Sequence, residues 1–327
     1  MKGQCEVIWI PIVDKLTPWT EGKEQAFEAL RSLMSWFTIH HPSLIDQPVI
    51  RYIKEIWHLS KKPILVVLDP HGRVVCLNAL HMMSFWGILA FPLTRSRQDA
   101  VWKEETWRLE LLMDGIDPTT LNWIAEGRFI CMYGGEDMEL IRKFTATTRV
   151  VAQAARIPLE LVYVGKRNPR ERARKNMTKI SLEKLSYYWQ DLTSIWLFWV
   201  RLESMWYSKM QLGKTIENDP IMQEIMTMLS FDGSEQQWAL FSRGTTQMAK
   251  GKGEKILTSL TQFDSWKVDA EEKGFLRAMN DHLHKLHTTH HCNRLVLPGT
   301  IRIPEVVFCA EYGQIIERFM MYRCFTD

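Results

Sequence analysis

Short apolar runs alternate with segments of helical apolar spacing over the first half of the chain. The apolar runs predict strands at residues 5–13, 64–68, 73–78, 128–133 and 159–164. Apolar side chains three or four residues apart predict helices at residues 23–34, 49–59, 98–113 and 136–156, and Asp117-Pro118 predicts the start of a short helix. This alternation predicts an α/β fold.

Residues 62–75 are the most informative stretch. Five consecutive apolar residues, 64–68, predict a fully buried strand, and Asp69-Pro70-His71-Gly72 predicts a tight turn into an antiparallel partner. Pro63 stands just before the strand, as a proline does in thioredoxin-like sheets, where we expect a retained cis bond. A β-α-β unit at residues 128–164 adds parallel pairing. We therefore predict a thioredoxin-like mixed sheet flanked by helices.

The pattern changes after residue 165. A basic run at residues 166–175 (KRNPRERARK) indicates a domain boundary, and helices are predicted at 182–209, 220–229 and 273–286. Short strands are predicted at residues 294–297, 306–310 and 318–322. We therefore expect a thioredoxin-like domain at 1–165, a basic linker at 166–179 and a smaller α+β C-terminal domain at 180–327.

Composition narrows the class of protein. With 46% apolar and 24% charged residues, the chain is typical of a soluble globular protein, and its net charge of +3 demands neither nucleic acid nor an anionic membrane. Residues 74–94 lack Asp, Glu, Lys and Arg but include Asn78 and Pro92. A strand, buried helix and loop explain them better than a transmembrane span.

The cysteines carry no redox motif. Cys5, Cys76, Cys131, Cys292, Cys309 and Cys324 include no Cys-x-x-Cys pair. Scattered through so long a chain, they are expected to be reduced thiols in a cytosolic setting. A thiol oxidoreductase or redox sensor remains the alternative function, but Cys76 and Cys131 fall in apolar strand patterns where thiols are normally inert.

Other motifs have structural interpretations. Gly213-Lys214-Thr215 ends like a phosphate-binding loop, but Ser208 stands where the first glycine is needed, so we interpret Gly213 as a helix end. We interpret residues 134–137 (GGED) as a helix cap, because two carboxylates would repel phosphate. The basic run lacks interleaved aromatic residues and is expected to be solvated. The sequence offers no catalytic or cofactor-binding constellation.

A histidine-rich cluster lies near the end of the chain. His282, His284, His287, His290, His291 and Cys292 fall within eleven residues. We interpret it as an exposed helix end with unrelated buried cysteines. The alternative is a zinc site, for which His291, Cys292, Cys309 and Cys324 are the candidate ligands.

The segment 187–199 (YYWQDLTSIWLFW) is aromatic and, as a helix, apolar nearly all round. Such a helix is buried in a core or at an interface. Core packing is the default interpretation, and a self-association surface is the alternative.

Six segments together resemble the sieve-element-occlusion family, the phloem P-proteins that include forisome subunits. They are residues 62–70 (KPILVVLDP), 102–107 (WKEETW), 133–137 (YGGED), 218–226 (NDPIMQEIM), 229–234 (LSFDGS) and 290–299 (HHCNRLVLPG). The resemblance implies a non-enzymatic plant structural protein that self-associates, with itself and paralogous subunits, into filaments or bodies in the cytoplasm of sieve elements. It also implies roles in sieve-plate occlusion after wounding and in phloem development.

Two departures from the family qualify these expectations. Family members carry a further N-terminal domain, so we expect this chain to be a fragment or a truncated product. The family tends to show Cys-x-x-Cys-Gly near its end, where this chain has Cys309 and, in place of the second cysteine, Tyr312. Forisome subunits respond to calcium, but no dedicated calcium site is visible in this sequence.

Overall fold

Apolar runs and amphipathic segments fold here into a mixed α/β structure, seen in a computed structural model. The structure describes residues 5–13, 17–60, 62–167, 171–232, 236–244 and 247–286, and the backbone of three short strands beyond them. The chain forms two compact units, Met1–Leu80 and His81–Asp327.

The first unit is built from short elements. They are β1 (Ile8–Trp9), α1 (Glu21–Ser32), β2 (Phe37–Thr38), the 3-10 turn η1 (Pro42–Leu44), α2 (Gln47–Glu55), β3 (Val67–Leu68) and β4 (Val74–Cys76). β1 and β2 pair in parallel, and β3 and β4 form the predicted antiparallel hairpin. Asp69 closes that turn, because its carboxylate accepts hydrogen bonds from the backbone N–H groups of His71 and Arg73, both at 2.9 Å.

The prediction of a fully buried strand at residues 64–68 is wrong. Ile64 to Val67 are half-buried and Leu68 is exposed, because among the described residues β3 pairs only with β4. The cis peptide bond among the described residues precedes Pro92, not Pro63.

Longer elements make up the second unit. The helices are α3 (Leu80–Trp86), η2 (Gly87–Ala90), α4 (Arg95–Lys103), α5 (Leu109–Met113), α6 (Pro118–Ala125), α7 (Met138–Ala154), α8 (Glu171–Leu182), α9 (Leu192–Gln211), α10 (Pro220–Asp232), α11 (Glu254–Thr261), η3 (Phe263–Ser265), α12 (Lys267–Lys273) and α13 (Phe275–Lys285). The sheet strands are β5 (Phe129–Gly134), β6 (Leu159–Tyr163), β7 (Tyr187–Tyr188), β8 (Trp238–Arg243) and β9 (Gln247–Lys252).

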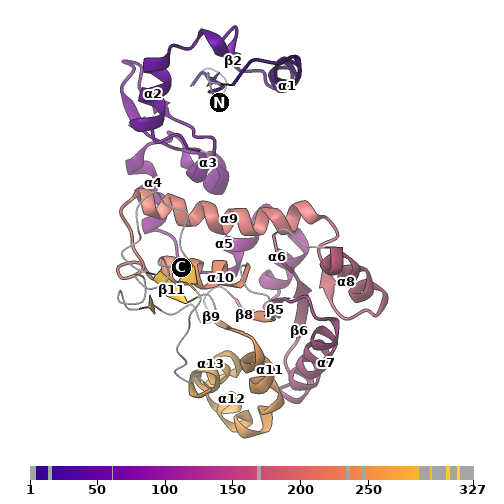
Figure 1. Ribbon diagram of the computed structural model, residues 1–327. Helices are drawn as coiled ribbons and strands as arrows, with labels where there is room; N and C mark the ends of the chain where they lie inside the picture. The colour runs from indigo at the N-terminus through magenta and orange to yellow at the C-terminus, as the bar shows by residue number, and fades with distance from the viewer. Residues whose placement is uncertain are drawn as a thin grey trace. The chain divides into compact units, whose positions relative to one another are not determined.

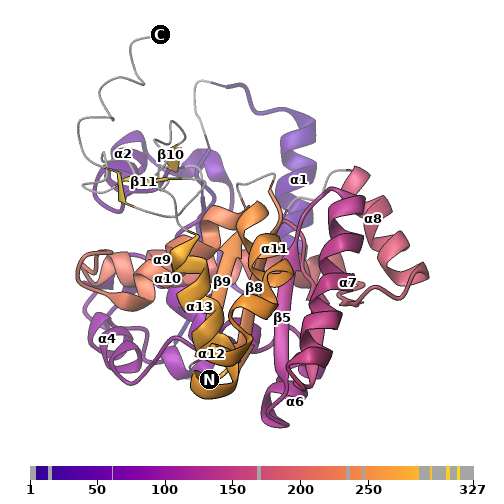
Figure 2. The ribbon, with the colours of Figure 1, turned by 90° about the horizontal axis from the view of Figure 1, so that it is seen from below.

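These strands form one mixed sheet in the order β7-β6-β5-β8-β9. β5 and β6 are parallel, as the predicted β-α-β unit requires, and β8 is antiparallel to β5. Helices cover both faces, with α9 and α10 on one side and α7, α11 and α13 on the other (Figures 1 and 2). Every residue of β5 is buried, as expected for a central strand covered on both faces.

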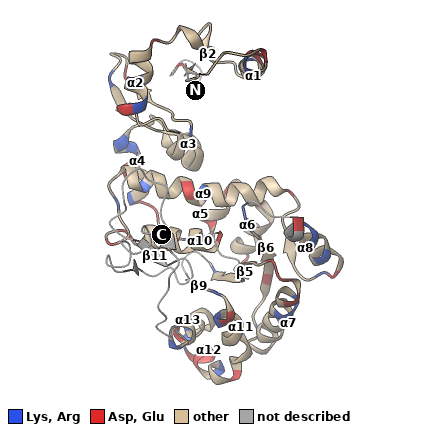
Figure 3. Cartoon of the chain, viewed as in Figure 1, with Lys and Arg blue, Asp and Glu red and all other residues tan. Residues whose placement is uncertain are grey.

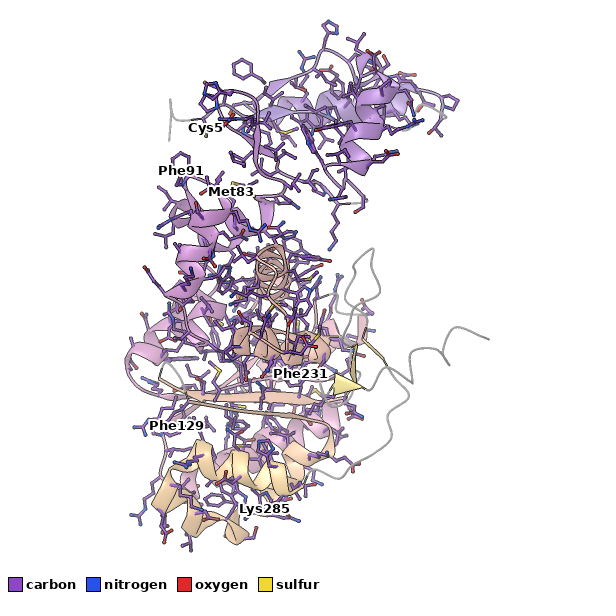
Figure 4. The ribbon with its side chains drawn as sticks, turned by 90° about the vertical axis from the view of Figure 1, so that its left-hand side faces the viewer. Cys5, Met83, Phe91, Phe129, Phe231 and Lys285 are labelled. Carbon is purple, nitrogen blue, oxygen red and sulfur yellow. The ribbon has the colours of Figure 1, made fainter. Side chains whose placement is uncertain are left out.

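Alternate residues of β8 pack into opposite layers. Trp238 stacks on Phe231 of α10, with ring centroids 5.5 Å apart, and meets Trp199 of α9 edge-on at 5.7 Å. Phe241 points the other way, toward Phe275 of α13. Figure 4 shows this sheet on edge, with Phe231 on one side and Phe129 on the other. The core of the unit therefore occupies both faces of the sheet.

Two predicted long helices are divided in the structure. The segment 98–113 forms α4 and α5, separated by extended backbone at Arg108, whose guanidinium pairs with Glu105 at 2.7 Å. The segment 182–209 is also not one helix: α8 ends at Leu182, β7 follows, and α9 begins after its cap Asp191. The spacing of apolar residues alone did not predict these two interruptions.

The units divide elsewhere than the predicted linker at 166–179. One sheet takes β5 and β6 from before that segment and β7, β8 and β9 from after it, and α8 covers residues 171–182. The hairpin β8–β9 was not predicted. It lies after the predicted linker but joins the sheet built before it, because buried apolar positions on β8 pack beside β5.

Three short strands near the end of the chain form a separate antiparallel sheet in the order β10-β11-β12. They are β10 (Leu295–Val296), β11 (Val307–Cys309) and β12 (Ile315–Ile316). β10 and β11 fall in predicted strands, whereas β12 was not predicted. The strand predicted at 318–322 lies outside the described residues.

Candidate functional site

The buried thiols lie in strands. Cys76 in β4 and Cys131 in β5 are free and buried, whereas Cys5 is free and exposed. Burial raises the pKa of the Cys76 thiol, and complete burial raises the pKa of Cys131 well above its ordinary value. Because the thiolate is the reactive form, both environments disfavour redox chemistry.

The turn after β5 is a helix cap, as predicted. Asp137 Oδ1 accepts hydrogen bonds from the N–H groups of Glu139 and Leu140 at 2.9 and 3.2 Å. Glu136 forms an ion pair with Lys166 at 3.2 Å. The start of α7 is therefore already complemented by the protein's own carboxylates.

Gly134, the last residue of β5, is required by close packing. A Cβ atom at this position would lie 2.3 Å from Trp238 Nε1. Trp238 is buried and packed on both sides, so its indole ring has no room to move aside.

Gly213 ends α9 and is not part of a phosphate loop. Its φ of +78° is left-handed, and its N–H donates to the carbonyl of Met210 at 2.9 Å. The next N–H, of Lys214, donates to Lys209 O at 3.1 Å. These bonds match the predicted helix end.

The start of the basic segment folds back onto acidic groups. Arg167 Nη1 lies 2.8 Å from Glu203 Oε2. Its backbone N–H donates to Asp232, whose pKa is raised by burial. Lys166 is held by Glu136. These cations are already engaged within the protein, while residues 168–170 lie outside the described residues.

The zinc candidates fall mostly outside the described part of the chain. His291, Cys292 and Cys324 are not described, and only the backbone of Cys309 is, in β11. Of the histidine cluster, His282 and His284 lie at the end of α13. His282 stacks on Trp266, and its Nδ1 lies 3.1 Å from Ser259 Oγ. Among the residues that the structure describes, no group of three His, Cys, Asp or Glu side chains is arranged to hold a metal ion.

Asp117 is a buried carboxylate whose network was not predicted. It caps α6 by accepting from Thr119 N–H and Thr120 N–H, at 3.3 and 3.2 Å. It also accepts from the hydroxyl of Tyr187 at 3.2 Å and from Trp189 Nε1 at 3.1 Å. These donors tie β7 and the chain after it to α6, so Asp117 has a structural role.

A second buried polar network joins α4, α9 and α10. Lys209 Nζ and Asp219 Oδ2 form an ion pair at 2.6 Å, and the ammonium lies 4.4 Å from the centre of the Trp102 ring. Ser208 Oγ accepts from Gln98 Nε2 and Trp102 Nε1 at 2.7 and 2.8 Å. Burial lowers the pKa of Lys209 in spite of its partner. Every group in this network faces another part of the same unit.

A hollow of about 430 Å³ lies beside β6 and β7. Two of its polar side chains are bonded within the protein. Arg149 Nη2 donates to the carbonyls of Lys184 and Leu185, at 2.9 and 2.7 Å. Ser186 Oγ lies 2.8 Å from the Tyr133 hydroxyl. Among its lining residues, no nucleophile is paired with a base.

The aromatic segment 187–199 belongs largely to the core, as the default interpretation predicted. Trp189, Ile195, Phe198 and Trp199 are buried. Trp196 on the outer side of α9 is exposed and remains available to a partner.

Apolar surface is concentrated on the first unit. Its large exposed apolar side chains are Ile8, Ile10, Leu30, Leu33, Trp36, Phe37, Leu44, Val49, Tyr52, Ile56, Leu68, Val74 and Leu77.

We define the β2 edge as residues 36–38. Sequence reasoning missed this strand, although the signal was present: residues 32–45 contain no Asp, Glu, Lys or Arg. Exposed apolar side chains mark an interaction surface where they adjoin one another, as Trp36 and Phe37 do in sequence.

No helix in the described part of the chain is both long and apolar enough to cross a membrane.

Comparison with known proteins identifies close relatives. The chain is 40% identical to Protein SIEVE ELEMENT OCCLUSION A of Arabidopsis thaliana and 39% identical to Protein SIEVE ELEMENT OCCLUSION B, over 98% of this chain in each case. These alignments cover 40% and 45% of the relatives, so this chain spans less than half of their length.

A shorter similarity links the chain to a different protein. It is 28% identical to Probable nucleoredoxin 3 of Oryza sativa subsp. japonica over 95 residues, 29% of this chain and 18% of that protein. No solved structure matches.

The family profile described as Sieve element occlusion C-terminus matches residues 96–326, which is most of the chain. That match and the identities to the Arabidopsis proteins agree with the resemblance drawn from the six sequence segments. This chain therefore belongs to the sieve element occlusion family.

Proposed function

We propose that this chain is a non-enzymatic structural protein of phloem that self-associates in the cytoplasm of sieve elements and contributes to their occlusion after wounding. The observation that carries the proposal is the 40% identity to Protein SIEVE ELEMENT OCCLUSION A over nearly the whole of this chain. Related subunits of the same family are the natural further partners, and phloem development is the natural setting.

The surface of the first unit supports self-association. Large apolar side chains exposed in one small unit are unfavourable in a protein that remains monomeric, because burying each square ångström contributes roughly 25 cal/mol. In the second unit, by contrast, Asp137, Arg167 and Lys209 are engaged in capping or internal ion pairs. This distribution suits assembly better than catalysis.

We further infer that the beginning of the chain has a thioredoxin-like fold that serves as a building block. The order β1-α1-β2-α2-β3-β4, with β1 parallel to β2 and β3 antiparallel to β4, resembles the succession of elements in a thioredoxin-like domain, although the two strand pairs form separate sheets here. The similarity to Probable nucleoredoxin 3 over 95 residues of this chain is in keeping with a thioredoxin-like element. The alternative function, a thiol oxidoreductase, lacks support from the buried Cys76 and Cys131.

Sedimentation velocity of the purified chain over a concentration series tests the proposed self-association. We expect the weight-average sedimentation coefficient to rise with concentration. A monomer at every concentration would contradict self-association of this chain.

Expression of the fluorescently tagged chain in phloem tests the location separately. We expect it to collect at sieve plates after wounding, together with the related proteins. An unchanged, uniform distribution after wounding would contradict the occlusion role.

A further inference from the structure

The β2 edge presents backbone hydrogen-bonding groups that no strand covers among the described residues. The N–H of Phe37 donates to the carbonyl of Val7, the residue just before β1, at 3.0 Å, so the backbone groups of Phe37 face β1. Successive residues of a strand alternate in direction, and the groups of Trp36 and Thr38 therefore face away from β1. Thr38 keeps its side chain turned toward β1, where its hydroxyl donates to Trp9 O at 3.2 Å.

The edges of β9, β1 and β7 carry features that oppose pairing. The outer strand β9 contains Lys250 and Lys252, and β1 is followed by Pro11. Just before β7, Arg149 occupies the carbonyls of Lys184 and Leu185. Lysine, proline and covered carbonyls are the usual protections of an edge strand. The β2 edge has none of them.

The absence of charged residues allows the β2 edge to lie against the same edge of a second copy. No Asp, Glu, Lys or Arg occurs between Arg31 and Asp46. Figure 3 shows β2 in tan, while α1 and α2 carry charged positions. Two identical charged edges would repel each other, whereas two neutral ones do not. The window is also rich in aromatic and β-branched residues, which favour strand pairing.

We propose that β2 of one copy pairs along its outer edge with β2 of a second copy, in antiparallel orientation about a two-fold axis. Each edge offers alternating N–H and C=O groups, so an antiparallel pair of the same strand satisfies both copies. The exposed side chains of Trp36 and Phe37 lie beside that edge and become buried between the copies. This inference rests on the proposed self-association and names the surface that carries it.

Charge-swap variants of the full chain test the pairing by sedimentation velocity. Phe37→Lys and Phe37→Glu each place like charges opposite one another across the two-fold axis. We expect each variant alone to associate at least about tenfold more weakly than the natural chain. An equimolar mixture of the two should recover association, since the charges are then opposite.

Val150→Lys is the matched control. Val150 is 66% exposed on α7 and Phe37 is 63% exposed on β2, so both substitutions add the same charge at similar exposure. We expect Val150→Lys to associate like the natural chain. In the natural chain, the amides of Trp36 and Thr38 should also exchange hydrogen more slowly as concentration rises.

The outcomes separate the two proposals. If the natural chain associates and both Phe37 variants associate equally well, pairing through β2 is overturned while self-association stands. If the natural chain is monomeric throughout, self-association and its β2 surface are overturned together. Failure of the mixed variants to recover association would overturn the two-fold arrangement.

Discussion

Residues 64–68 of the first unit and β5 of the second are similar continuous apolar runs with different burial. Every residue of β5 is buried, because β6 and β8 pair with it on either side and helices cover both of its faces. In the run 64–68, Ile64 to Val67 are half-buried and Leu68 is exposed, since β4 is the one strand that pairs with β3 in the described part of the chain. An apolar run therefore predicts a strand that is favoured by burial, but the neighbouring strands and helices decide whether it is buried.

The same contrast holds for the two units as a whole. Among the described residues of the first unit, the buried hydrophobic side chains are Phe27, Ile45, Ile50, Ile53, Cys76 and Ala79. The large continuous core lies in the second unit, between Phe85 and Met279. The second unit is expected to be stable by its own packing, and the first to gain most from a partner.

The largest expected effect is loss of packing in the second unit. Trp238→Ala removes a side chain that is 1% exposed and should lower the free energy of opening of the sheet by about 3–5 kcal/mol. Native-state hydrogen exchange of the β5 and β8 amides measures this locally. Trp196→Ala, at a 45% exposed position on α9, is the control and should cost about 1 kcal/mol. Equal losses in the two variants would contradict the description of the core.

Glycine-to-alanine substitutions should change the stability of the two units in opposite directions. Gly134→Ala forces a Cβ against Trp238 and should destabilise the second unit by about 1–3 kcal/mol. Gly22→Ala lies in α1 with no atom within 4 Å of the added Cβ, and should stabilise that helix by about 0.5–1 kcal/mol. Amide exchange in β5 and in α1 reports the two changes. A neutral Gly134→Ala variant would show that the turn after β5 is loosely packed.

Lowering the pH should destabilise the first unit through protonation of Glu24. A hydrogen bond from Trp19 Nε1, and then one with His41, lower the pKa of Glu24 from its ordinary value of 4.5. The stabilisation from these contacts is complete above the ordinary pKa and is lost as pH falls through the lowered one. The indole N–H resonance of Trp19 should follow this loss in an NMR titration. In Glu24→Gln the acid step should vanish, and its persistence would assign it to another group.

The smallest effect is expected at an exposed apolar position of the first unit. Leu33 is 81% exposed, so Leu33→Ser should change the free energy of opening of α1 by no more than about 0.5 kcal/mol. Hydrogen exchange of the α1 amides at low protein concentration measures it. A larger loss would show that Leu33 packs within the unit.

Local chemistry made several elements predictable from the residues alone. Asp117-Pro118 begins α6, Asp137 caps α7, and Gly213 ends α9, because caps and left-handed glycines act over a few neighbouring residues. The β-α-β unit from β5 to β6 was predictable for the same reason, since its apolar runs and its amphipathic helix are contiguous.

Strand pairing between segments distant in the sequence was harder to predict from the sequence. The hairpin β8–β9 joins the sheet beside β5, although more than a hundred residues separate Phe129 from Arg243 in the pair that opens the ladder. The interruption between α8 and α9 depends on β7 pairing with β6 and on Tyr187 reaching Asp117. Such contacts leave little trace in local periodicity.

The sequence by itself determined the family, through six idiosyncratic segments, and the α/β class, through alternating apolar patterns. Only the tertiary structure decided which apolar runs are covered and which strand edges stay open. The reason is that burial depends on neighbouring elements. β5 has a strand on each side and helices on each face, while β2 has β1 as its one neighbouring strand among the residues that the structure describes.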